Sequence, residues 1–145
     1  MPTGAVQGAV VVLTVVSVVA SVGLHYEGLN HMARRLARGG GEKRRRVLFA
    51  VIGVLSLLAT EIWIFGVAYW LALMLPDAGA VAGAGDGLLD AVYLSAMTFS
   101  TVGFGDVAPH GAIRVIAAAE AVLGLFLIAW SATFTYLEME QHWRR

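Results

Sequence analysis

The 145-residue sequence contains no cysteine, only three prolines and few charged residues. The lack of cysteine excludes disulfide bonds, thiolate metal sites and cysteine nucleophiles. Charged residues make up 14% of the chain, well below the roughly 25% that is usual for a soluble globular domain. Hydrophobic residues make up 59%. The composition therefore indicates a protein surrounded by lipid rather than by water.

Three apolar stretches, residues 5–24, 47–75 and 112–137, reach the length of about 20 residues that a helix needs to cross a bilayer. The first stretch has the alternative interpretation of a cleaved secretory signal peptide. A signal peptide carries basic residues before its apolar run, whereas here the basic residues follow it. We therefore predict three membrane-spanning helices.

Basic residues give these helices a direction. Seven of the ten Lys and Arg residues lie between residues 34 and 46, and short loops rich in Lys and Arg stay in the cytoplasm. We expect a multi-pass protein of the cell membrane, with an extracytoplasmic N-terminus and a cytoplasmic C-terminus. Residues 29–46 form either an amphipathic helix on the inner membrane surface or a solvated basic linker. Anionic lipid is a candidate partner for Arg44, Arg45 and Arg46.

The segment between the second and third stretches contains an apolar run, residues 88–100, that is too short to cross the membrane. Apolar runs of about 10–14 residues are typical of re-entrant helices. Non-helical backbone at membrane depth must line a water-filled cavity or be buried in protein. Residues 101–106, which follow the run, are therefore the first candidate for a functional site.

Residues 101–106 read Thr-Val-Gly-Phe-Gly-Asp and closely resemble the signature of potassium channels, TVGYGD. A selectivity filter replaces the water around a cation with backbone carbonyl oxygens, which four strands point at one axis. Glycine at alternate positions permits the backbone angles that turn these carbonyls inward. The resemblance implies a homotetramer that passes K⁺ passively. It implies that K⁺ is bound by Thr101, Val102, Gly103, Phe104 and Gly105.

The same resemblance gives roles to residues around the filter. Phe104 stands where tyrosine is commoner, so a hydroxyl contact with the pore helix is missing, and its side chain and that of Val102 are expected to pack behind the filter. Tyr93 either donates a hydrogen bond to the filter aspartate or only packs. The expected filter supports are Asp106, Tyr93, Thr98 and Ser100.

The third span resembles the inner helix of potassium channels. A glycine in that helix often acts as a bending point, and Gly124 lies near the matching position. If the register holds, one face of the span borders the cavity below the filter. The residues expected on that face are Leu125, Ile128, Ala132 and Thr133.

Two acidic residues lie inside predicted spans. Glu61 is about 14 residues into the second span, roughly 21 Å along a helix, and Glu120 is about eight residues into the third. Ionisable residues inside a membrane are costly and are candidates for function, here gating. One hypothesis is that Glu120 braces the pore helix through Thr98 or Ser100. Another is that Glu61 and Glu120 share a proton, which would make opening pH-sensitive. The alternative is that each is a protonated carboxyl bonded to a backbone carbonyl.

A smaller group of titratable residues, His25, Glu27 and His31, follows the first span. Metal binding favours two histidines four residues apart on one helical face. His25 and His31 are six apart, so a helix does not bring them together. We expect a hydrated cluster at the membrane interface.

These observations predict an all-α membrane protein with three transmembrane helices, a re-entrant pore helix and a selectivity-filter loop, assembled as a tetramer. No nucleophile with a nearby base, phosphate loop or redox ligand set is present, so we do not expect an enzyme. The alternatives are a non-selective cation channel and a non-conducting membrane scaffold or partner subunit. The predicted units are a first span at 1–28, a basic segment at 29–46, a pore domain at 47–137 with its pore helix at 88–100 and filter at 101–106, and a tail at 138–145.

Overall fold

The computed structural model describes residues 4–38 and 43–143, so the expected basic segment and tail lie partly outside the described residues. Three of its helices are long and apolar enough to cross a membrane, which confirms the spans expected from the sequence. The fourth helix is short and occupies the expected place of the pore helix. The four are α1 (Gly4–Arg38), α2 (Lys43–Leu73), α3 (Leu88–Phe99) and α4 (Arg114–Trp143).

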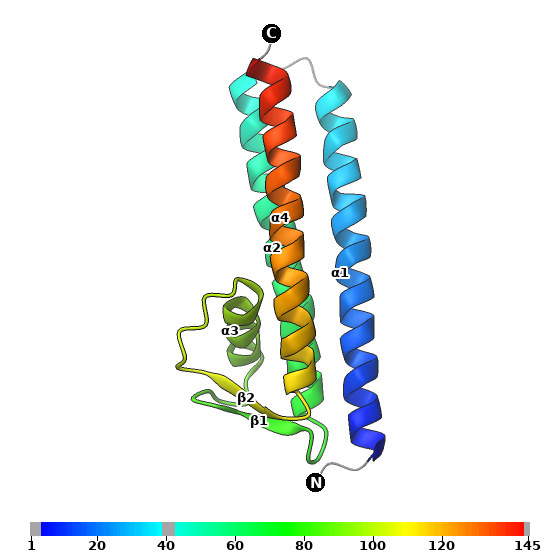
Figure 1. Cartoon of the computed structure of the whole chain (residues 1–145), viewed down its shortest axis with the longest axis vertical. Helices are drawn as coiled ribbons and strands as arrows, with labels where there is room; N and C mark the ends of the chain where they lie inside the picture. The colour runs from blue at the N-terminus through cyan, green and yellow to red at the C-terminus, as the bar shows by residue number, and fades with distance from the viewer. Residues whose placement is uncertain (1–3, 39–42, 144–145) are drawn as a thin grey trace.

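The three long helices run side by side, and the short elements gather at one end of the bundle (Figure 1). α1 packs against both α2 and α4, and α3 also contacts α2 and α4. The N-terminus lies at the same end as α3, whereas the C-terminus lies at the opposite end (Figure 1). Residues 101–106 therefore leave α3 beside the α2–α4 pair, on the side away from α1.

α1 is one continuous helix of 35 residues, so no helix boundary falls at residue 28. Leu29 and Met32 pack with Val54 and Leu57 of α2, and this contact continues the helix beyond its most apolar part. The segment after residue 28 thus follows the bundle instead of forming a separate helix. Residues buried along α1 recur every three or four positions, on one helical face: Val10, Thr14, Ser17, Ser21, His25, Leu29, Met32 and Leu36.

Two short strands join the segments on either side of α3. β1 (Gly79–Ala82) and β2 (Ala108–Gly111) pair antiparallel, with Gly79 opposite Gly111 and Ala82 opposite Ala108. The all-α prediction was therefore incomplete. These segments are rich in glycine and alanine, which are depleted in strands, so their pairing depends on the fold that brings them together.

Glycines let α3 approach both of its neighbours at backbone distance. A Cβ atom on Gly66 of α2 would lie 2.8 Å from the Cα of Val92. One on Gly124 of α4 would lie 3.0 Å from the Cα of Phe99 and closer still to its carbonyl oxygen. The sequence marked Gly124 as a bending point, and the structure adds a packing reason for glycine at this position. α3 is thus wedged between two long helices.

Replacing Gly124 with alanine should destabilise the protein, although alanine is the better helix former. The new Cβ would collide with the Phe99 backbone, and overpacking costs roughly 1–3 kcal/mol. Thermal unfolding of the purified protein measures the loss. Gly8→Ala in α1 is the matched control, because a Cβ there meets nothing within 4 Å. Equal stability of the two variants would contradict the close contact.

Candidate functional site

Residues 101–106 form irregular backbone that stays close to the end of α3. The N–H of Thr101 donates to the carbonyl of Thr98 at 3.1 Å, and the N–H of Gly103 donates to the carbonyl of Met97 at 3.2 Å. Both acceptors lie in the last turns of α3. The position of this segment is therefore tied to the position of the helix.

The handedness of the backbone alternates along this segment. φ is 59° at Thr101, 48° at Gly103 and 83° at Gly105, whereas Val102 and Phe104 do not have positive φ. Alternating handedness aligns neighbouring backbone polar groups on one side of the chain. Positive φ is also rare for a β-branched residue such as Thr101, and such strain clusters at functional sites. The backbone of this segment therefore differs from that of both a helix and a strand.

One chain leaves this segment uncovered. Val102 is 53% exposed and Phe104 is 72% exposed. A Cβ added to Gly103 or Gly105 would meet nothing within 4 Å. The cover that was expected behind the filter is thus not supplied by the same chain.

Asp106, the last residue of the segment, is fixed from two sides. The hydroxyl of Tyr93 on α3 donates a hydrogen bond to Asp106 Oδ2 at 2.8 Å, which confirms the contact considered from the sequence. This bond raises the pKa of the Tyr93 hydroxyl, so the phenol remains protonated and able to donate. The carbonyl oxygen of Asp106 lies against Gly83, where φ is +80° and a side chain would overlap it.

Thr98 and Ser100 bond within α3 itself. Thr98 Oγ1 donates to the carbonyl of Leu94 at 2.8 Å, and Ser100 Oγ donates to the carbonyl of Ala96 at 2.6 Å. Such bonds to the preceding turn are usual for hydroxyl side chains in helices. Neither residue is the partner of Glu120, so the expected bracing partners were wrong.

Glu120 of α4 joins α2 and α3 through a buried network. Its Oε1 accepts a hydrogen bond from Ser95 Oγ at 2.5 Å, and its Oε2 accepts one from Tyr69 Oη at 2.6 Å. All three side chains are fully buried. Because both carboxyl oxygens have donors, the cost of burying the acid is offset. The expected brace between Glu120 and the pore helix is present, with Ser95 as its partner on α3.

Glu61 of α2 pairs with His25 of α1 rather than with Glu120. His25 Nδ1 lies 2.8 Å from Glu61 Oε1, and both side chains are fully buried. On α4, Ser131 Oγ lies 3.4 Å from His25 Nε2, and the Trp130 ring centroid lies 5.2 Å from the imidazole centroid. Two predictions were therefore wrong. His25 is not hydrated at the interface, and the two acids do not share a proton.

The Glu61 pair has little other support. Glu61 Oε2 has no hydrogen-bond partner among the described residues, so His25 supplies the compensation for burying this carboxyl. Within residues 4–38 and 43–143, no three His, Cys, Asp or Glu side chains gather to hold a metal ion. The cluster is thus a polar contact between α1 and the two helices α2 and α4.

The expected cavity residues divide into two groups on α4. Leu125, Ala132 and Thr133 are exposed, and the Thr133 hydroxyl donates to the carbonyl of Ala129 at 3.0 Å. Ile128 instead packs partly against the core of its own chain. Three of the four therefore lie on a face that one chain leaves open.

Sequence reasoning missed the partners of both buried acids. Tyr69 and Ser95 resemble ordinary residues of apolar helices, and no local pattern pairs them with Glu120. The partner of Glu61 had a local signal, because Thr14, Ser17, Ser21 and His25 form a polar stripe at helical spacing in an otherwise apolar stretch. A polar stripe on a membrane helix marks the face that contacts other helices.

Residues 101–106 lie within the part of the chain that matches a known protein family. A family model described as "Ion channel" matches residues 50–140. Two relatives named Protein LctB are similar over a shorter stretch. The protein from Geobacillus stearothermophilus is 46% identical over 54 residues, and the one from Bacillus caldotenax is 45% identical over 53. Each match covers 37% of this chain and only 40% of the relative. No solved structure matches the chain.

Tyr69→Phe should lower the stability of the protein by roughly 1–3 kcal/mol, because it leaves a buried carboxyl oxygen without its donor. Thermal unfolding in detergent measures this change. Tyr136→Phe, also on a long helix, is the matched control, since Tyr136 is 60% exposed. A loss of the same size in both variants would argue against the Glu120 network.

His25→Leu should lower the free energy of unfolding by roughly 3–5 kcal/mol, because it leaves the buried Glu61 carboxyl without its partner. The double variant His25→Leu/Glu61→Leu should recover most of this loss, since it removes both polar groups together. Unfolding temperatures of the two single variants and the double variant give the coupling. Simple addition of the two single losses would show that the pair does not interact.

Proposed function

This chain belongs to the ion channel family, and we propose that it is one subunit of a homotetrameric, potassium-selective channel. Residues 101–105 are its filter. One observation carries the proposal: a TVGFGD sequence lies on backbone of alternating handedness, directly after a short helix between two membrane-length helices. Family membership assigns ion conduction to the chain and not enzymatic catalysis.

Potassium passes when protein oxygens replace its water shell. Four copies of the filter around one axis surround the ion with backbone carbonyl oxygens, and Thr101 adds its hydroxyl at the inner end. The C-terminal end of α3 carries the partial negative charge of the helix dipole and favours a cation in the cavity. The ion moves down its own electrochemical gradient, so K⁺ is the cargo and no resident cofactor takes part.

The exposed apolar side chains near the filter support a tetramer. Phe104 is 72% exposed, and Val122 of α4 is 73% exposed. Lipid does not cover side chains beside an aqueous pathway, whereas neighbouring subunits related by rotation can bury them. The cavity below the filter is lined from α4 by Leu125, Ile128, Ala132 and Thr133.

Three residues are the gating candidates of this channel. Glu120 and Gly124 link α4 to the pore helix, so a movement of α4 at this level acts on the filter. Glu61 links α2 to α1 through His25. The basic end of the bundle faces the cytoplasm, where anionic lipid meets Arg44, Arg45 and Arg46.

A non-selective cation channel is the second candidate, and Phe104 is the observation that favours it. Phenylalanine lacks the hydroxyl with which tyrosine fixes the filter to the pore helix. The width and rigidity of the carbonyl cage influence the choice between K⁺ and Na⁺. A filter with one contact fewer conducts both ions more evenly.

Liposomes containing the purified protein should take up K⁺ faster than Na⁺, by more than about tenfold, or about 1.4 kcal/mol in barrier height. Gly103→Asp should abolish this uptake, because it places a charged side chain in the filter at a residue with φ of 48°. Gly4→Asp introduces the same side chain in the first turn of α1, where nothing lies within 4 Å, and should leave uptake unchanged.

The remaining outcomes separate the alternatives. Equal K⁺ and Na⁺ uptake, lost in Gly103→Asp, would favour the non-selective channel. Absence of any uptake over a range of pH, voltage and lipid composition would contradict the channel and favour a non-conducting scaffold.

A further inference from the structure

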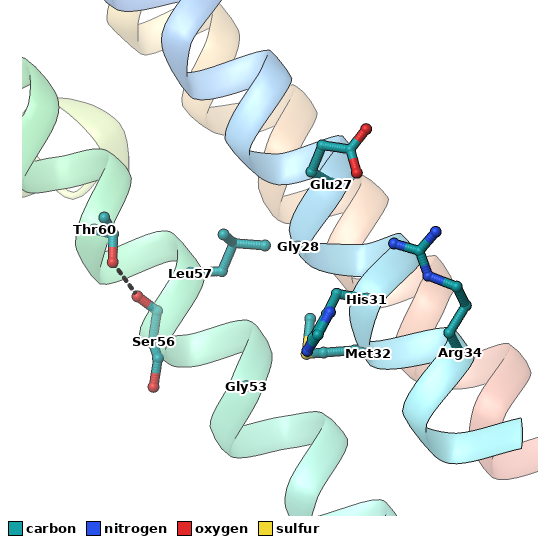
Figure 2. A pocket seen from close by; sticks show the side chains of 9 residues that line it. All are labelled: Glu27, Gly28, His31, Met32, Arg34, Gly53, Ser56, Leu57 and Thr60. Atoms are coloured by element: carbon teal, nitrogen blue, oxygen red, sulfur yellow. Dashed lines mark hydrogen bonds between the residues drawn. The ribbon is translucent and has the colours of Figure 1, made fainter. Parts of the chain in front are cut away.

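A groove runs between α1 and α2 near the basic end of the bundle. It has a volume of about 520 Å³ and is open along one side. Figure 2 shows residues that line it, among them Glu27, His31 and Arg34 on α1 and Ser56, Leu57 and Thr60 on α2, with Leu57 directed toward Gly28. The family match begins at residue 50, so the α1 wall lies outside the matched region.

Two glycines create the floor of the groove. Leu57 of α2 packs on Gly28 of α1, where a Cβ would lie 2.9 Å from its methyl carbons. Met32 of α1 packs on Gly53 of α2, where a Cβ would overlap its sulfur. The helices therefore meet closely along the floor, while Ser56, a small side chain that also lines the groove, leaves it open as a trough.

The wall on α2 presents little free polarity to the groove. Ser56 Oγ donates to the carbonyl of Ile52 at 2.8 Å, and Thr60 Oγ1 donates to the carbonyl of Ser56 at 2.8 Å. Both hydroxyls are thus used within their own helix. Beyond Thr60 a second groove of about 400 Å³ continues between the same helices, lined mainly by apolar side chains such as Leu13, Trp63 and Leu71.

Positive charge is concentrated at the other end of the groove. Arg34 lines it, and Arg35, Arg38 and the cluster Arg44–Arg46 follow on the same end of the bundle. The structure gives Arg34 no ion-pair partner within residues 4–38 and 43–143. The site thus joins an apolar trough to an unpaired guanidinium.

We propose that this groove binds one anionic phospholipid, with its phosphate at Arg34 and His31 and one acyl chain along the trough toward Thr60. A guanidinium binds phosphate oxygens through paired N–H donors, and an imidazole N–H adds a third. The acyl chain covers apolar walls that lie at membrane depth. The cytoplasmic leaflet carries most anionic lipid. The positive charge at Arg34 and the depth of the apolar groove therefore both fit an anionic phospholipid. This site does not depend on which ion the channel conducts.

Glu27 allows the proposal to be tested by the direction in which lipid binding changes. It lies one turn from His31 on the wall of the groove, and its negative charge opposes an anionic headgroup. Removing this charge should strengthen binding, whereas removing the charge of Arg34 should weaken it. A diffuse attraction between the basic end and an anionic surface would not distinguish these positions from their neighbours.

Native mass spectrometry of the purified protein with phosphatidylglycerol or phosphatidylcholine of equal chain length tests the site. The wild type should retain phosphatidylglycerol in preference. Arg34→Gln should lower its retention about fivefold, which corresponds to about 1 kcal/mol, and Glu27→Gln should raise it. Arg35→Gln is the matched control, because it removes the same charge from the next residue, which does not line the groove. Equal losses in Arg34→Gln and Arg35→Gln would overturn the proposal.

A second pair of variants tests the acyl chain without a change of charge. Ser56→Phe fills the trough and should lower phosphatidylglycerol retention, whereas Leu55→Phe, at a neighbouring residue that is 61% exposed, should not. Retained lipid in Ser56→Phe would place the chain elsewhere and refute the groove. A change in oligomeric state, with lipid binding unaltered, would show that another copy of the chain occupies it.

Discussion

The carboxyl group of Glu120 joins α2, α3 and α4, and the TVGFGD segment that follows α3 depends on this contact for its position. α3 has 12 residues, and a helix of that length neither crosses a bilayer nor is stable by itself. Besides the apolar side chains that it buries in the core, α3 is held by Ser95, which shares the Glu120 carboxyl with Tyr69, and by the close backbone contacts at Gly66 and Gly124. Because the backbone of Thr101 and Gly103 bonds to the last turns of α3, the same contacts influence the position of the TVGFGD segment.

The second buried acid performs a different task with a similar chemistry. Glu61 binds His25, and His25 approaches Ser131 and Trp130 of α4. In hydrocarbon an acid without a partner costs several kcal/mol. Separation of α1 from the bundle would expose both members of the pair to that cost. α1 is therefore attached to α2 and α4 by a specific polar contact in addition to apolar packing.

The sequence was sufficient where a local pattern determines the structure. Long apolar runs predicted the three spans, a run too short to cross predicted α3, and alternate glycines predicted the unusual backbone at Gly103 and Gly105. The strands and the partners of the acids were not accessible in this way. Ala82 pairs with Ala108 only because the chain, after α3 and the segment that follows it, comes back beside β1. Similarly, Ser95 and not Thr98 bonds to Glu120, and hydroxyl residues at both positions look alike in the sequence.

The register of the small sheet has a consequence for the folding of the site. The pairing of Ala82 with Ala108 makes residues 83–107, which include α3 and the TVGFGD segment, a loop whose two ends are already joined. If the two ends of this loop were not paired, entropy would be lost in bringing them together each time residues 101–106 became ordered. With the ends joined, residues 101–106 become ordered within a loop that is already closed, so the entropy of loop closure is not lost again at this step. The sheet also links the ends of α2 and α4 next to it, so it limits the relative movement of these two helices at this end of the bundle.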